Sequence, residues 1–524
     1  LGTARGNRGG LRLELRGVLP LRLEHAVIWL PITVGVLLRL IQLWMPIVGV
    51  HSWRQADTAA MARHFALSDT PIWLPQIDWA GAAEGYVESE FPLFPFLVSR
   101  LYQLFGVQEW LGRGLSLLCS ALTIWLVIRL GRRWFGARAG WWGGLFFAIA
   151  PLGVYYGRTF QAEALLLLCG AGCLEAHSHW RRQGPVWALL LSWLCFTCAG
   201  LIKVIPLLWL GLPLLMVQLN VEPQLEAATQ MNILRRTKGL LRSPGFWLYV
   251  GASLAAIAAW YAHAYQLGQT SGFSFGFWGG GSDRSSLSLL LDPGNWFNLS
   301  LRVALRLLAI AGVPFLFSGI WLSWRSPGGR TAISGLLGVL LCTLATMRSS
   351  SIHEYYQLPL LLFACPLMGL GWHRWQQRCR RWHSTALISL WLAISLAVLT
   401  FDYWALEQRQ VRDWMPLAME IRQELPQGNR IVSVTSTDPT LLNLARRQGW
   451  LISSKQLTPE RLQAWREQGA SHLAGSFRWE KMYRPMSEGR QRALRNLAAS
   501  SAGAWVDDVS QTYLIPLDDL SASP

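Results

Sequence analysis

Residues 26–64 read AVIWLPITVGVLLRLIQLWMPIVGVHSWRQADTAAMARH, an apolar run followed at once by a polar and charged segment. The run 26–50 is long enough to cross a bilayer as a helix. Similar runs recur along the 524 residues, of which 52% are hydrophobic and only 15% charged, whereas a soluble protein carries about 25% charged residues. The sequence therefore predicts a polytopic α-helical membrane protein whose first span leads directly into Arg54 and Asp57.

About eleven transmembrane helices are expected. They cover residues 26–50, 110–130, 140–156, 161–177, 185–201, 204–219, 245–266, 299–323, 331–347, 356–372 and 384–401. Basic residues gather in the N-terminal segment and after every second span, as cytoplasmic loops do. The basic segment 1–25 is therefore expected to be cytoplasmic rather than a cleavable signal peptide, and an odd number of spans places the C-terminal residues outside a plasma (inner) membrane.

The net charge of +17 does not indicate a nucleic-acid partner. Residues 402–524 carry 15 Lys and Arg against 14 Asp and Glu, so 32 basic and 16 acidic residues remain in the membrane part. That excess lies mainly in short loops between apolar runs, which is the topological signature of a membrane protein and not a nucleic-acid footprint.

The eight cysteines do not predict a zinc site or a disulfide framework. Seven lie in apolar runs, and none lies in the C-terminal tail. Cys195 and Cys198 have CxxC spacing, but they lack a second pair and polar surroundings, so we interpret them as helix-packing residues.

The first outward loop, residues 51–109, is expected to be catalytic. It holds seven of the sixteen acids of the membrane part, and it contains two candidate interfacial helices. One covers 54–67; the other covers 91–105, which is too short to span and is opened by prolines. A further outward loop, 267–298, is rich in Gly and aromatic residues and is expected to be mobile.

The tail, residues 402–524, is predicted to be a small extracytoplasmic α/β domain. Strands are expected at 430–436 and 450–453, with helices at 440–448 and near 459–468. Alternation of strands and helices is typical of that class. No catalytic motif is evident in it.

Asp57 is the leading candidate for a general base. It follows the first span on the outer face, where partial desolvation raises the pKa of a carboxyl group. The alternative is a structural acid, paired with Arg54 or Arg63. Glu90, before the second interfacial helix, is a second candidate, with helix capping as its alternative. Glu88 is expected to be solvated.

Cations on the outward side break the charge trend and favour an anionic ligand. Arg54, Arg158, Lys203 and Arg348 all lie there, and Arg and Lys bind phosphate. Lys203 sits between two spans with almost no loop, so it is either functional or snorkelling to the interface.

Five stretches carry a resemblance to a known family. They are Trp53-Arg-Gln-Ala-Asp57, Glu90-Phe-Pro-Leu-Phe-Pro95, Tyr156-Gly-Arg-Thr-Phe-Gln-Ala-Glu163, Leu201-Ile-Lys203 and His353-Glu-Tyr-Tyr-Gln-Leu-Pro359. In this order they resemble the GT-C glycosyltransferases, in particular the polyprenyl-phosphate-sugar branch with the protein O-mannosyltransferases and lipid A aminoarabinose transferases. The resemblance covers 26–401, and the tail resembles the domain appended in bacterial members. Many members have two adjacent acids where this chain has Asp57-Thr58, which leaves open whether Glu90 assists Asp57.

The resemblance implies an inverting transfer from a polyprenyl-phosphate sugar to an acceptor hydroxyl on a glycolipid, polysaccharide or protein. Asp57 would act as general base, with Glu90 as second catalytic acid. The implied substrate-binding residues are Arg54, Arg158, Glu163, Lys203, Arg348, His353, Tyr355 and Tyr356. No nucleotide-binding loop or metal-ligand cluster is visible in the sequence, so neither a cofactor nor a metal is expected.

Two other functions are compatible with the composition. An O-antigen-type ligase or polymerase would use a lipid diphosphate oligosaccharide. A transporter or lipid flippase would place ionisable groups near mid-bilayer, where Arg39 is the clearest internal charge. Clustering of the candidate residues at one face favours the transferase.

Overall fold

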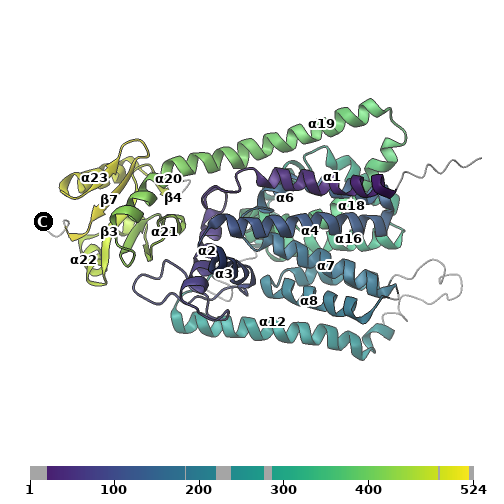
Figure 1. Cartoon of the computed structure of the whole chain (residues 1–524), viewed down its shortest axis with the longest axis horizontal. Coiled ribbons are helices and arrows are strands. Elements are labelled where there is room, and N and C mark those ends of the chain that lie inside the picture. Colours follow the sequence, from purple (N-terminus) through teal and green to yellow (C-terminus); the bar gives the residue numbers. More distant parts are fainter. Residues whose placement is uncertain (1–20, 183, 220–237, 276–285, 482–483, 519–524) are drawn as a thin grey trace, which may run out of the picture.

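The computed structural model describes residues 21–182, 184–219, 238–275, 286–481 and 484–518, with side chains from residue 29 onward. Its helices form an elongated bundle, and the C-terminal residues form a small domain of strands and helices at one end (Figure 1). Helices α2 (Ser52–Leu67) and α3 (Leu93–Phe105) lie at that same end. The two parts of the chain that were predicted to face outward are therefore neighbours in space.

The bundle consists of helices that follow the apolar runs. They are α1 (Leu21–Leu40), α4 (Glu109–Phe135), α5 (Ala137–Ile149), α6 (Pro151–Tyr156), α7 (Glu163–Arg181), α8 (Val186–Ile202), α9 (Pro206–Leu219), α12 (Pro244–Ser271), α13 (Leu287–Leu291), α14 (Pro293–Arg302), α15 (Gly312–Ser323), α16 (Pro327–Ala345), α17 (Met347–Ile352), α18 (Leu360–Gln376) and α19 (Arg381–Val398). Of the described helices, four are long and apolar enough to cross a membrane alone, and one bent pair adds a fifth. The number eleven stays a prediction.

Three predicted spans are not single straight helices. In the run 26–50 the helix ends at Leu40, and residues 41–50 form turns with a positive φ at Gln42. The run 299–323 is divided between α14 and α15, which meet at 96°. Between them lie a π-helical turn at Val303–Leu307 and two residues with positive φ, Ala309 and Ile310. The run 140–156 is divided at Ala150, because Pro151 lacks an N–H group and disfavours helical conformation in the residue before it.

A single helix joins the bundle to the C-terminal domain. α19 continues through a π-helical turn, Leu399–Trp404, into α20 (Ala405–Glu424). The 44-residue helix Arg381–Glu424 thus runs through residue 402, the predicted start of the tail domain, and leads to the sheet (Figure 1).

The sheet of this domain has the strand order β2-β1-β3-β7-β6. Its strands are β1 (Arg430–Val434), β2 (Gly449–Leu451), β3 (Ala470–Ser476), β6 (Trp505–Asp507) and β7 (Thr512–Pro516), and β4 (Trp479–Lys481) pairs separately with β5 (Arg484–Pro485). β1 runs parallel to β2 and β3, and β7 is antiparallel to β3 and β6. Helices α21 (Thr440–Ala445), α22 (Pro459–Glu467) and α23 (Glu488–Ser500) complete it. The strands and helices predicted near 430, 440, 450 and 459 are all present.

Arg39 is a structural residue of the bundle. Its side chain is fully buried. The guanidinium donates to Ser120 Oγ at 3.1 Å and to the carbonyl oxygens of Gly35, Ala148 and Gly153 at 2.8–3.0 Å. A buried polar group satisfied in this way holds helices together, so Arg39 offers no support for a transport pathway.

Candidate functional site

A cavity of about 480 Å³, including its open mouth, lies where α2 faces the segment before α3. Five predicted site residues meet in its lining: Arg54, Asp57, Glu90, Glu163 and Lys203. They come from three different outward turns of the chain, so only the tertiary fold brings them together. The rest of the lining is mainly apolar, with Phe91, Pro92 and Ile202 among its residues.

A tight turn at Gly49 sets the direction of α2, which lies at the end of the bundle. Gly49 has φ +102°, and a Cβ there would lie 2.5 Å from Tyr155 Oη and 2.8 Å from Glu407 Cγ, so only glycine fits. His51, with φ 54°, then precedes the first turn of α2. The buried face of α2 carries small residues such as Ala56, which let the helix sit close to its neighbours.

Asp57 is a buried carboxyl group that forms no ion pair with any residue the structure describes. Its side chain is 3% exposed, and its one carboxylate contact is a hydrogen bond of 3.0 Å from Trp79 Nε1. Arg54 pairs with Glu90 and Arg63 with Asp78, so neither salt bridge considered for Asp57 is formed among the described residues. Burial raises the pKa of Asp57 to about 7, against the lowering effects of the Trp79 hydrogen bond and the Arg54 charge. A carboxyl group with that pKa is suited to accept a proton near neutral pH.

The two cations of the cavity are each held by an acid. Glu90 pairs with Arg54, and Glu163 pairs with Lys203. Among the described residues, the side chain of Glu90 bonds to Arg54, and α3, which begins at Leu93 after the N-cap Pro92, has no side-chain cap. Lys203 is 11% exposed and held in place, rather than extended to the interface. An entering anion would therefore meet cations that are already positioned.

An aromatic cluster lies behind Lys203. The ammonium nitrogen of Lys203 is 4.6 Å from the centre of the Tyr355 ring and 5.3 Å from that of Tyr356. The imidazole of His353 stacks on Tyr355 at 5.4 Å with an interplanar angle of 15°. Burial lowers the pKa of His353 to about 3, with His51 and Lys203 adding to the effect. His353 is thus neutral at physiological pH, and this cluster backs Lys203 without lining the cavity.

Arg158 and Arg348 do not line the cavity. Arg158 is fully buried and forms an ion pair of 2.6 Å with Glu407 of α20. Arg348 lies exposed on α17. Its outward position and the family resemblance predicted that Arg158 binds the phosphate, whereas in the fold its side chain joins the bundle to α20. Its surroundings are those of a structural residue.

Replacing Arg158 by Gln is expected to destabilise the fold by about 3–5 kcal/mol, because Glu407 would become an uncompensated buried charge. Thermal unfolding of the purified protein measures this loss. The double variant Arg158→Met/Glu407→Leu removes both charges and is expected to recover most of it. An increased donor KM at parental stability would instead return Arg158 to the substrate site.

Sequence reasoning missed several residues that the structure places at the site. Gln161 lines the cavity and is 1% exposed, yet neither its amide oxygen nor its amide nitrogen has a hydrogen-bond partner in the described parts of the chain. It lies inside the quoted stretch Tyr156–Glu163, but an uncharged residue gave no signal there.

Glu88, expected to be solvated, is only 5% exposed and accepts a hydrogen bond from Ser274. That expectation was wrong because the segment beyond α12 covers it.

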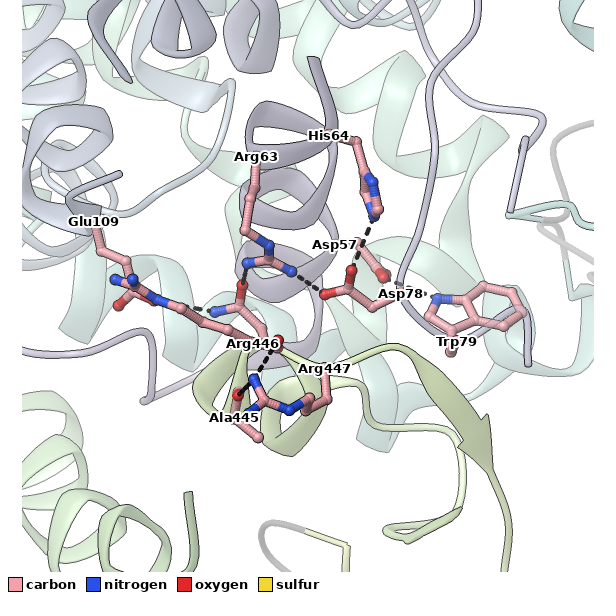
Figure 2. A network of polar contacts seen from close by, with 10 residues as sticks. Asp57, Arg63, His64, Asp78, Trp79, Glu109, Ala445, Arg446 and Arg447 are labelled. Atoms are coloured by element: carbon pink, nitrogen blue, oxygen red, sulfur yellow. Dashed lines mark hydrogen bonds and ion pairs between the residues drawn. The ribbon is translucent and has the colours of Figure 1, made fainter. Parts of the chain in front are cut away.

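A second group of polar residues, of which only Arg63 was considered from the sequence, lies beside Asp57. Figure 2 shows Asp78 between Arg63 and His64 of α2, and Trp79 reaching toward Asp57. Burial opposes ionisation of Asp78, but Arg63 and His64 outweigh it and hold the pKa of this carboxyl below its usual range. Asp78 is therefore an ionised structural acid, unlike Asp57.

In the parts of the chain that the structure describes, no three His, Cys, Asp or Glu side chains gather as metal ligands would. All eight cysteines are free.

Part of this chain matches a known family. Residues 89–261 match the model of the dolichyl-phosphate-mannose-protein mannosyltransferases. The matched segment runs from the residue before Glu90 to α12 and includes Glu163 and Lys203. No curated protein matches the sequence.

Solved structures resemble most of the chain. ArnT from Cupriavidus metallidurans in the apo state superimposes with a TM-score of 0.65 at 16% identity, covering 95% of this chain and 99% of that one. The same protein bound to undecaprenyl phosphate gives 0.63 at 15% identity, with the same coverage. The archaeal oligosaccharyltransferase AglB from Archaeoglobus fulgidus, in complex with an inhibitory peptide and a dolichol-phosphate, gives 0.52 at 12% identity, covering 87% of this chain and 69% of that one. The expected resemblance is confirmed: this membrane protein has the GT-C fold.

Proposed function

We propose that the chain is a membrane glycosyltransferase that moves a sugar from a polyprenyl phosphate to an acceptor hydroxyl on the extracytoplasmic face. One observation carries this assignment: a buried carboxyl group with a pKa of about 7 shares a cavity with two positioned cations. A base and a phosphate-binding pair are the two components that such a transfer needs. The fold supports the same class, since ArnT was crystallised bound to undecaprenyl phosphate and AglB was solved in complex with a dolichol-phosphate.

In the proposed reaction Asp57 takes the proton of the acceptor hydroxyl. The acceptor oxygen forms a bond to the anomeric carbon while the bond from that carbon to the phosphate oxygen breaks, and polyprenyl phosphate leaves. Attack from the face opposite the phosphate inverts the anomeric configuration. Arg54 and Lys203 stabilise the charge that grows on the leaving phosphate, and no metal is required for that step.

The carboxylates of the cavity have a different proposed role. Glu90 and Glu163 hold the two cations in place before the donor arrives. Arg and Lys each carry several N–H donors, so a phosphate can accept charge-assisted hydrogen bonds from both cations while each of them keeps its carboxylate partner. The unpaired amide of Gln161 supplies a donor and an acceptor, the pattern that a sugar hydroxyl matches. We expect Tyr355 and Tyr356 to hold Lys203 in place.

The deciding experiment is mass spectrometry of membrane lipids from cells with the parental protein and cells with Asp57→Asn. We expect one polyprenyl-phosphate sugar to accumulate in the variant, because its consumption is blocked; its mass identifies the sugar. Asp69→Asn, an exposed acid just beyond the same helix, is the matched control and is expected to leave the lipids unchanged.

Two other results would replace this function. Accumulation of only a diphosphate-linked oligosaccharide would identify an O-antigen-type ligase or polymerase. Unchanged lipid-linked sugars in Asp57→Asn cells would count against a transferase of either kind and leave transport as the function to test.

A further inference from the structure

The C-terminal domain is hydrogen-bonded to both ends of the helix that carries Asp57. Near the start of α2, Thr440 Oγ1 of α21 donates to Ser52 Oγ at 3.0 Å. Near its end, Asn443 Oδ1 of α21 accepts a hydrogen bond of 3.0 Å from Arg63 Nη1. The same amide donates at 3.3 Å to Glu109, the first residue of α4. One short helix of the tail therefore fixes α2 against the bundle.

The domain also holds the loop that follows α2. The backbone N–H of Gly449 in β2 donates to the carbonyl of Asp78 at 2.9 Å, and the N–H of Gly81 donates to the carbonyl of Gly449 at 2.8 Å. These two bonds flank Trp79. Gly81 has φ +63°, and a Cβ there would lie 2.3 Å from the indole nitrogen of Trp450. The loop thus needs glycine to lie on the end of β2.

The side chain of Asp78 ties the loop back to α2. It pairs with Arg63 and lies 3.0 Å from Nε2 of His64. Arg63 therefore contacts Asn443 of the tail and Asp78 of the loop with one guanidinium. Figure 2 shows the contact between Arg63 and Asp78. Trp79, the residue after Asp78, therefore lies between two positions of the loop that are hydrogen-bonded to β2, and the first of them is also bonded to α2.

That residue, Trp79, is the one whose indole reaches Asp57. Its Nε1 donates to Asp57 Oδ1 at 3.0 Å. Its ring contacts Phe273 at 5.6 Å and Phe275 at 6.3 Å between centroids, and it also packs on the buried cluster formed by α20, α21 and the sheet. A ring fixed on two faces directs its N–H group with little freedom.

We propose that the C-terminal domain positions the carboxyl group of Asp57 by holding Trp79 in place, so that Trp79 is a positioning residue for sugar transfer. This role rests on the function proposed above. It gives the tail a part in the reaction although the tail contributes no residue to the cavity lining.

The acidity of Asp57 gives this role a distinctive readout. A hydrogen bond to a carboxylate stabilises its charged form, so loss of the indole N–H raises the pKa of Asp57. A base must be deprotonated to act, and transfer by the parent is therefore expected to rise with pH through about 7. The other charged groups around Asp57 are Arg54, Asp78 and Asp438 near it, and Glu90, Glu163 and Lys203 in the cavity.

The test compares the pH dependence of kcat in the full-length parent, Trp79→Phe and Gly81→Ala. We expect Trp79→Phe to move the midpoint upward by about one pH unit, which lowers kcat about tenfold at pH 6 and little at pH 9. Gly81→Ala displaces the loop from β2. It is therefore expected to move the midpoint of the pH profile upward as well, and to speed the exchange of backbone amide hydrogens in residues 75–87. Trp73→Phe, at an exposed Trp of the same loop, is the control.

A parental midpoint in both Trp79→Phe and Gly81→Ala, or an equal loss of kcat at every pH, would overturn the positioning role. In either case transfer by the parent would still stand. Absence of transfer by the parent would refute the proposed function itself. If Trp79→Phe fails to fold, the positioning role is judged from Gly81→Ala alone, by its pH midpoint of kcat and by its amide hydrogen exchange in residues 75–87.

Discussion

Asp57→Asn is expected to lower the rate of sugar transfer by about 10²- to 10⁴-fold, the range that a general base contributes. Asparagine keeps the size of the side chain and can still meet the indole of Trp79, but it cannot take a proton from the acceptor hydroxyl. The measurement is transfer by the purified protein in detergent or nanodiscs, from an isolated polyprenyl-phosphate sugar. Donor binding is expected to persist, since Arg54 and Lys203 remain.

The exposed acid Asp69 supplies the matched control, because Asp69→Asn removes the same charge from the same segment. Its rate is expected to equal that of the parent. Asp57→Asn also removes a buried ionisable group, so its unfolding temperature at pH 8 is expected to be no lower than that of the parent. An Asp57→Asn protein that transfers sugar at the parental rate would exclude Asp57 as the base.

The second large effect is expected at Lys203. Lys203→Gln removes one of two cations from the cavity and is expected to raise the donor KM by about 10- to 100-fold, since a hydrogen bond to a charged group is worth about 1.5–3 kcal/mol. The acceptor KM is expected to change little. Steady-state kinetics with each substrate varied in turn separates the two.

One complication is the carboxylate that Lys203 leaves behind. Glu163 is 5% exposed, and without its partner it would be a buried uncompensated charge. The double variant Lys203→Gln/Glu163→Gln removes that charge, so a folded protein with the same donor defect would assign the effect to the lost cation. Arg100→Gln, at an exposed Arg of α3, serves as the control. Equal donor titrations for parent and double variant would exclude Lys203 from phosphate binding.

Much of the helical framework could be predicted from the sequence because apolar runs have to be long to cross a bilayer and are easily recognised. The runs 110–130 and 245–266 coincide with α4 and α12. The failures came where the backbone departs from regular helix, as between α14 and α15. A bend of that kind depends on packing around Ala309 and Ile310, which hydropathy does not record.

The site was predicted in part, because charged residues stand out in an apolar sequence and uncharged ones do not. Charges near apolar runs stand out, so Asp57, Glu90 and Lys203 were found, and all three line the cavity. Arg158 has the same signal but pairs with Glu407, nearly 250 residues away. Gln161 and Trp79 carry no charge and were missed, although one lines the cavity and the other contacts Asp57.

The sequence by itself determined that this is a polytopic helical protein, with acids and cations gathered after apolar runs and an α/β tail. Those properties follow from local composition and periodicity, which are written in consecutive residues. Only the tertiary structure decided which charges pair, which acid stays unpaired, and how the tail reaches Asp57 through Trp79. Pairing and burial depend on contacts between residues far apart in the chain, and those contacts set the acidity of each group.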